Sequence, residues 1–167
     1  SPGGRDELLM RLAKSGVMYV PAFYDVEYLE DGRIRRVSPN RPGVPWRVAK
    51  HTVMDLDEWP YPKAPLVPIA ESVHERMSVE IFRGCTRGCR FCQAGMITRP
   101  VRERSMTTIA DMVANGLEKT GYEEIGLLSL SSADHSEIAE IAKGLADRYE
   151  DTQTSLSLPS TRVDAFN

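Results

Sequence analysis

The chain has 167 residues, of which 41% are hydrophobic and 27% charged, a composition typical of a soluble globular domain and not of a disordered chain. It contains no apolar run near the roughly 20 residues that a membrane-spanning helix needs and no secretory signal, so we expect a cytoplasmic protein. The formal net charge of −3 excludes a global signal for nucleic-acid binding. Because the chain starts at Ser1 without an initiator methionine and stops at Asn167, just after a predicted strand, we expect a fragment.

The first 37 residues predict a helix followed by a β-hairpin. Leucines recur at helical spacing over residues 5–14. Residues 26–37 hold Asp31-Gly32 between apolar positions, and this dipeptide favours a two-residue hairpin turn because glycine tolerates positive φ. We interpret residues 1–37 as the end of a preceding domain.

Residues 38–77 are expected to form an extended connector that is rich in proline. Seven of the eleven prolines lie within residues 38–68, and each removes a backbone donor and restricts φ. In the middle of this segment, we expect Leu56 and Trp59 to attach the chain to a neighbouring surface.

Residues 78–167 show a regular alternation of strand and helix patterns. The expected strands are 78–83, 124–130 and 154–158, and the expected helices between them are 107–120 and 134–149. This order predicts a parallel sheet with right-handed crossovers. We expect Thr108 and Asp111 to form a capping box at the start of the first helix and Gly121 to end it.

Three parallel strands can begin an open sheet or a (β/α) barrel, and periodicity alone does not choose between them. In barrels, the functional residues lie in loops at the C-terminal ends of the strands. Here the loops 84–92, 129–134 and 157–162 are all polar or reactive. We therefore predict an α/β fold, namely the N-terminal half of a (β/α) barrel, with its three loops converging on one face.

The three cysteines of the chain, Cys85, Cys89 and Cys92, lie within eight residues in the pattern C-x3-C-x2-C. An odd number of cysteines this close together is a poor disulfide framework and a good metal site. Such a loop can present three thiolates to three irons of a [4Fe–4S] cluster and leave the fourth iron open. Gly84 and Gly88 would allow the backbone to turn tightly beside the cluster.

The cysteine spacing, the aromatic residue Phe91 before the last cysteine and the strand before the first resemble the signature of the radical S-adenosylmethionine (SAM) superfamily. A narrower branch is also similar, in which a radical SAM barrel with no settled substrate follows a cobalamin-binding-type domain. The stretches that carry this second resemblance are residues 79–85, 90–96, 99–104, 55–60, 129–132 and 157–160.

The resemblance implies that SAM binds the open iron and that one electron from an external donor cleaves it to methionine and a 5′-deoxyadenosyl radical. Phe91 is at the position that borders the adenine, and Ser131 and Ser132 stand where many members carry a Gly-Gly-Glu run for the SAM amino group. Ser157 and Arg162, beyond the third strand, are further candidate cofactor contacts. Cobalamin is a candidate cofactor of the full-length protein only. The family barrel has six strands, of which three are predicted here.

Two other functions are compatible with the cysteines. One is an iron–sulfur or redox module that does not cleave SAM. The other is a zinc-stabilised interaction domain, which would need a fourth ligand, although all three histidines lie outside the cysteine loop (residues 85–92).

Residues 83–104 hold six arginines and one acid, a local net charge of +5. These arginines could balance the cluster, bind the SAM carboxylate or attract RNA or another polyanion, or else form ordinary salt bridges. His135 beside Asp134 suggests catalysis, but Asp134 followed by Glu137 also fits a helix N-cap, and the cap is favoured.

Overall fold

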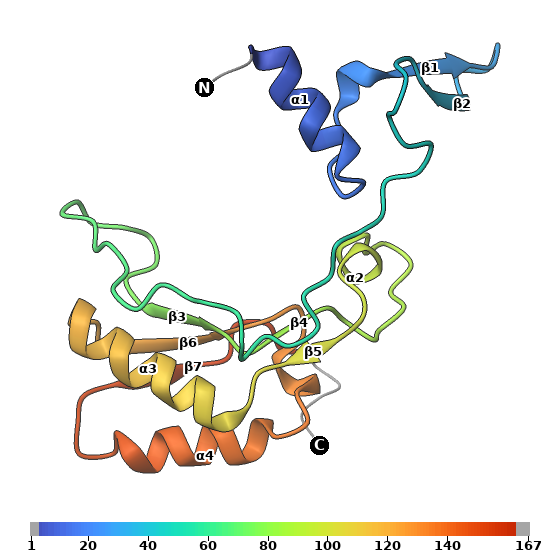
Figure 1. Cartoon of the computed structure of the whole chain (residues 1–167). Coiled ribbons are helices and arrows are strands. Elements are labelled where there is room, and N and C mark those ends of the chain that lie inside the picture. The colour runs from blue at the N-terminus through green and yellow to red at the C-terminus, as the bar shows by residue number, and fades with distance from the viewer. Residues whose placement is uncertain (1–3, 163–167) are drawn as a thin grey trace. The chain divides into compact units, whose positions relative to one another are not determined.

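The computed structural model describes residues 4–162, which divide into two compact units with the boundary between Thr52 and Val53 (Figure 1). This boundary falls inside the proline-rich segment. Unit 1 contains α1 (Arg5–Lys14), the 3₁₀-helix η1 (Pro21–Phe23), β1 (Tyr24–Tyr28) and β2 (Ile34–Pro39). Unit 2 contains β3 (Met77–Glu80), β4 (Phe82–Arg83), α2 (Ala94–Ile97), β5 (Arg102–Glu103), α3 (Met106–Thr120), β6 (Glu124–Leu128), the 3₁₀-helix η2 (Ser132–Asp134), α4 (Ile138–Arg148) and β7 (Ser155–Ser157).

Unit 1 confirms the predicted helix and hairpin, with one difference in the turn. Strands β1 and β2 pair antiparallel. The Leu29 N–H bonds to the Arg33 carbonyl at 2.8 Å, so the loop has three residues, and Gly32 takes its left-handed position with φ 82°. The expected two-residue turn is therefore wrong, because Asp31-Gly32 forms the second part of a longer loop with a left-handed glycine.

Unit 2 confirms the predicted parallel sheet. The strand order is β3-β6-β7, and both neighbouring pairs are parallel. Figure 1 shows α3 and α4 lying side by side along the sheet. Within this sheet, β3 pairs with β6 and β6 pairs with β7, so the order in the sheet follows the order in the chain. Right-handed crossovers between such strands place both helices on the same face.

The expected strand over residues 78–83 is wrong in its second half. The chain leaves the parallel sheet at Ile81, whose N–H bonds to the Leu128 carbonyl at 3.0 Å while its carbonyl accepts from the Arg104 N–H at 2.9 Å. Beyond this point β4 pairs antiparallel with β5 in a separate two-stranded sheet. Ile81 is thus the residue at which the chain turns away from the main sheet toward the cysteine loop.

The two faces of the parallel sheet differ in polarity. One face packs its apolar side chains against buried residues of α3 and α4, such as Ile109 and Ile141. The sheet residues of this face are Met77, Val79, Ile125, Leu127 and Leu156. Side chains alternate along a strand, so the opposite face carries Ser78, Glu80, Gly126, Leu128, Ser155 and Ser157.

The helix ends follow the predicted residues only in part. Gly121 ends α3 in the left-handed conformation, as expected, with φ 70°. The N-cap of α3 is Ser105, whose hydroxyl accepts the Thr108 N–H, so the expected Thr108 and Asp111 box is wrong. Helix α4 begins at Ile138, four residues later than expected, because Asp134 belongs to η2. Within residues 4–162, no helix is long and apolar enough to cross a membrane.

Candidate functional site

The cysteine loop follows β4 and leads into the short helix α2. Gly84 precedes it with φ +98°, and a Cβ atom at this position would lie 2.6 Å from the Pro100 carbonyl oxygen. Only glycine therefore allows the start of the loop to lie against residues 98–101. Gly88, in contrast, has open space around it and no positive φ, so the structure gives its backbone no comparable need for glycine.

The three thiols differ in exposure and surroundings. Cys85 is buried, whereas Cys89 and Cys92 are half-buried, and all three are free cysteines. The Gly95 N–H donates to Cys92 Sγ at 3.5 Å, and a Cβ at Gly95 would lie 3.6 Å from Cys85 Cβ and 3.9 Å from Cys92 Sγ. Gly95 thus lies next to both Cys85 and Cys92, at ordinary contact distance.

Across residues 4–162, no three histidine, cysteine or acidic side chains are gathered closely enough to form a metal site. The donor types in the loop nevertheless suit an iron–sulfur cluster, which binds protein thiolates. A tetrahedral zinc site would need a fourth ligand. Within residues 4–162, neither His74 nor His135 joins the cysteines in such a group, and the buried His135 has both ring nitrogens in hydrogen bonds with the backbone.

An ion pair joins the cysteine loop to the turn after β6. Arg87 Nε donates to the Asp134 carboxylate at 2.8 Å, and Arg87 Nη2 donates to its second oxygen. The hydrogen bond from Arg87 lowers the pKa of Asp134, with a smaller electrostatic contribution from Arg162, while burial opposes the shift. Asp134 is therefore not the helix cap that its position in the sequence suggests.

The serine loops after β6 and β7 are also joined directly. The Ser132 N–H donates to the Ser160 carbonyl at 2.7 Å, and Ser132 Oγ donates to the Leu127 carbonyl at 3.1 Å. Ser131 Oγ is buried and makes no well-formed hydrogen bond with any residue in 4–162, although it lies near enough to Asp134 to help lower the pKa of that group. The structure thus connects the three predicted loops through backbone and side-chain contacts.

The remaining candidate cofactor residues lie in different environments. The Phe91 side chain is 93% exposed and contacts no core. Ser157 lies in β7, paired with Gly126 of β6, and is half-buried. Arg162 is the last residue that the structure describes, and its charge acts on Asp134.

Most arginines of the predicted basic patch bind groups of the chain itself. Arg83 forms a two-point ion pair with Glu80 at 2.7 Å, which raises the Arg83 pKa. Arg102 and Arg104 are buried. Arg90 is exposed and has no hydrogen bond or ion pair with any residue in the described range. The net charge of the segment therefore overstates the positive charge that is available to a polyanion.

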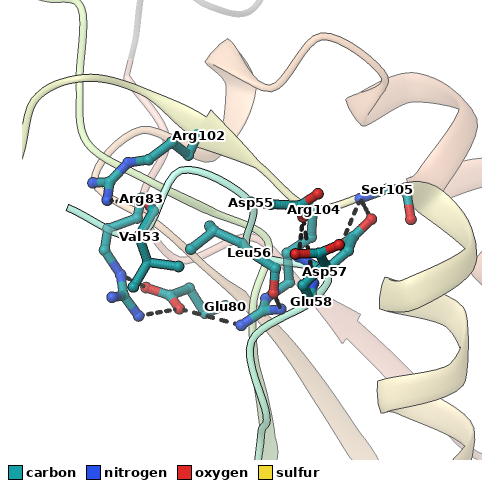
Figure 2. Close-up of polar contacts among 10 residues, drawn as sticks. All are labelled: Val53, Asp55, Leu56, Asp57, Glu58, Glu80, Arg83, Arg102, Arg104 and Ser105. Carbon is teal, nitrogen blue, oxygen red and sulfur yellow. Dashed lines mark hydrogen bonds and ion pairs between the residues drawn. The ribbon is translucent and has the colours of Figure 1, made fainter.

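Arg102 and Arg104 hold residues 53–58, which we name the strap, against unit 2 (Figure 2). Arg102 Nη1 donates to the Val53 carbonyl at 3.1 Å, and Arg104 Nη1 donates to the Leu56 carbonyl. Asp57 accepts the Ser105 N–H at 3.2 Å, next to the start of α3. These contacts span about fifty positions of sequence, and nothing in the local pattern indicates them.

The expected anchoring of the connector is half correct. Leu56 is 1% exposed and forms part of the core, as predicted. Trp59 is 51% exposed, so it is not an anchor within unit 2. Asp55 accepts the backbone N–H groups of Asp57 and Glu58, and this turn directs Leu56 inward (Figure 2).

His135 forms hydrogen bonds with the backbone through both of its ring nitrogens. Its Nδ1 accepts the Glu137 N–H at 3.1 Å, so its Nε2 carries the proton and donates to the Arg104 carbonyl at 3.1 Å. The imidazole thus supplies the backbone hydrogen bond at the start of α4 that Asp134 was expected to supply.

Comparison with known proteins agrees with the motif. A model of the radical SAM superfamily matches residues 79–166. An uncharacterised protein of Methanocaldococcus jannaschii is 26% identical over 151 residues, which cover 86% of this chain and 30% of the relative, so the chain spans less than a third of that protein. No solved structure matches the chain. Since the family model covers more than half of the sequence and includes all three cysteines, the chain belongs to the radical SAM superfamily.

Proposed function

We propose that Cys85, Cys89 and Cys92 hold one [4Fe–4S] cluster and that the chain contributes to an enzyme that cleaves SAM reductively. A bound cluster of this kind would supply the electron for SAM cleavage and an open iron for SAM. The observation that carries the proposal is a loop of three free thiols that starts at the tightly packed Gly84 and lies in the segment that matches the family. Family membership favours this function over a redox module or a zinc-stabilised domain.

Several residues are proposed to face SAM. The buried Ser131 hydroxyl lacks a well-formed hydrogen bond within residues 4–162, and such a group is available to a ligand. Ser132 and Arg162 lie in the connected loops, and Ser157 is on the polar face of the sheet. Phe91, whose ring is exposed, is proposed to cover the adenine.

We further propose that the sheet is half of a (β/α) barrel. Parallel sheets are normally covered on both faces, yet Leu128 is 37% exposed on the face opposite the helices. Further strands of a longer protein would enclose this face. We therefore expect residues 1–167 alone to cleave SAM poorly even with a cluster bound, because later strand ends would complete the SAM pocket. An upstream cobalamin-binding domain stays a prediction of the family resemblance.

Anaerobic reconstitution tests the cluster. The chain should bind about four iron and four sulfide, and alanine at any one of Cys85, Cys89 or Cys92 should abolish stable loading. Formation of 5′-deoxyadenosine by the full-length protein would distinguish SAM cleavage from simple redox transfer. Stoichiometric zinc in protein purified without air, or four firmly bound irons in the Cys89→Ala variant, would refute the assignment.

A further inference from the structure

The side chain of Arg99 binds the backbone at the start of the cysteine loop. Its Nε donates to the Cys85 carbonyl at 3.1 Å, and its Nη2 donates to the carbonyls of Thr86 at 3.2 Å and Arg87 at 3.0 Å. One guanidinium thus holds three consecutive peptide groups. Arginine suits this task because its donors form a planar, rigid fork, whereas lysine presents a compact point charge.

These contacts determine where the amides of the loop point. In a trans peptide, the carbonyl of one residue and the N–H of the next point in opposite directions, and the peptides after Cys85, Thr86 and Arg87 are trans. Carbonyls turned toward Arg99 therefore turn the N–H groups of residues 86–88 away from it. The Thr86 and Gly88 N–H groups donate to no acceptor in residues 4–162. Free backbone amides that point to the same side of a loop attract anions.

The backbone on either side of Arg99 is itself held in place by hydrogen bonds. Arg102, which is buried, donates to the Thr98 carbonyl at 2.8 Å and to the Pro100 carbonyl at 2.9 Å, on either side of Arg99. The third donor of Arg102 binds the strap at Val53. The backbone that carries Arg99 is therefore fixed on both sides, and Arg99 can hold the start of the cysteine loop in a defined position.

We propose that Arg99 is a positioning residue for the iron–sulfur site, which orients the first turn of the cysteine loop so that its amides face the bound anion. This inference rests on the proposed function, since the anion is the cluster with its thiolates. Hydrogen bonds from amides to cluster sulfurs are one of the factors that set the reduction potential. Arg99 would act on the cluster through the backbone and without touching it.

The first test uses the chain without a cluster and measures alkylation of each cysteine by mass spectrometry. Arg99→Gln should raise the alkylation rate of the buried Cys85 about tenfold, because three hydrogen bonds from a charged donor are lost. Arg90→Gln is the matched control, since it removes the same charge from within the cysteine loop itself and Arg90 has no partner in the described chain. Equal rates for the two variants, or equal acceleration at all three cysteines, would overturn the proposal.

The second test uses the reconstituted chain and measures the midpoint potential and the rate of iron loss to a chelator. Arg99→Gln should lower the potential more than Arg90→Gln does and release iron about tenfold faster. Arg99→Lys should resemble Arg99→Gln, because one ammonium cannot span three carbonyls. Full rescue by lysine would show that charge alone suffices and would overturn the proposal. Absence of a cluster in the wild-type chain would instead refute the proposed function, and alkylation would then decide whether Arg99 holds the loop.

Discussion

The Arg87 guanidinium and the Asp134 carboxylate form a two-point ion pair that ties the cysteine loop to the turn after β6. The two residues are 47 positions apart in the sequence. The pair therefore joins the cysteine loop to the loop after β6, and it makes the relative position of these two loops sensitive to the protonation of one carboxyl group.

Asp134→Asn should destabilise unit 2 by about 1 kcal/mol at neutral pH, because a neutral amide replaces one partner of a partly buried ion pair. The folded-state pKa of Asp134 lies below its usual value, so its stabilising contribution is complete above the unfolded-state pKa of about 4 and is lost as the pH falls through the folded-state pKa. Urea unfolding of the wild-type chain and the Asp134→Asn variant over an acidic pH series measures the difference in their free energies of unfolding. A difference that stays constant down to the lowest pH would contradict the assignment. Asp31→Asn, at an exposed ion pair, is the control and should change little.

Leu56→Ala should lower the free energy of unfolding by about 2–5 kcal/mol, because a fully buried side chain of the strap is removed and leaves a cavity. Trp59→Ala, three residues later, should change it by less than about 0.5 kcal/mol, since that ring is largely exposed. Chemical denaturation monitored by circular dichroism compares the two. Equal effects would mean that the strap is not held through Leu56.

Gly84→Ala should destabilise the chain by about 2 kcal/mol or more, because alanine resists the positive φ and its Cβ would meet the Pro100 carbonyl oxygen at 2.6 Å. Gly88→Ala in the cluster-free chain should be nearly neutral, since no atom lies within 4 Å of the added carbon. Thermal unfolding of the cluster-free proteins checks both. A stable Gly84→Ala variant would show that the close contact between Gly84 and residues 98–101 is not required.

His135→Ala should cost about 2 kcal/mol of stability, because it leaves the Arg104 carbonyl and the Glu137 N–H without their side-chain partner. Denaturant unfolding measures the loss, and SAM cleavage by the full-length protein provides the second readout. If the variant kept full stability and lost only SAM cleavage, His135 would be catalytic and its structural role would be secondary.

The features predicted correctly from the sequence depend on local patterns. Apolar spacing identified α3 and the parallel strands, because burial of one helical face or one strand face repeats with a fixed period. The end of α3 at Gly121 follows from a single residue that tolerates the left-handed conformation. The C-x3-C-x2-C spacing likewise lies within eight residues, so the candidate ligands needed no tertiary information.

Two of the errors arose where a partner remote in the sequence binds a group that the local pattern assigns elsewhere. Residues 78–83 alternate as one strand, but Ile81 bonds to Leu128 of β6 on one side and to Arg104, just after β5, on the other, so the strand is interrupted there. Asp134 has the type and place of a helix cap, yet a distant arginine binds it and His135 supplies the hydrogen bond to the start of α4. Local propensity cannot rank such alternatives, because the deciding partner is remote in the sequence.

By itself, the sequence determined the class of fold, the three candidate thiol ligands and the superfamily. Only the tertiary structure decided what the arginines do. Arg104 binds the Leu56 carbonyl, 48 positions away, and Arg99 binds three carbonyls of the cysteine loop. A guanidinium has the same charge wherever it lies, and whether it meets a ligand, a carboxylate or a backbone carbonyl depends on which segments the fold brings to it.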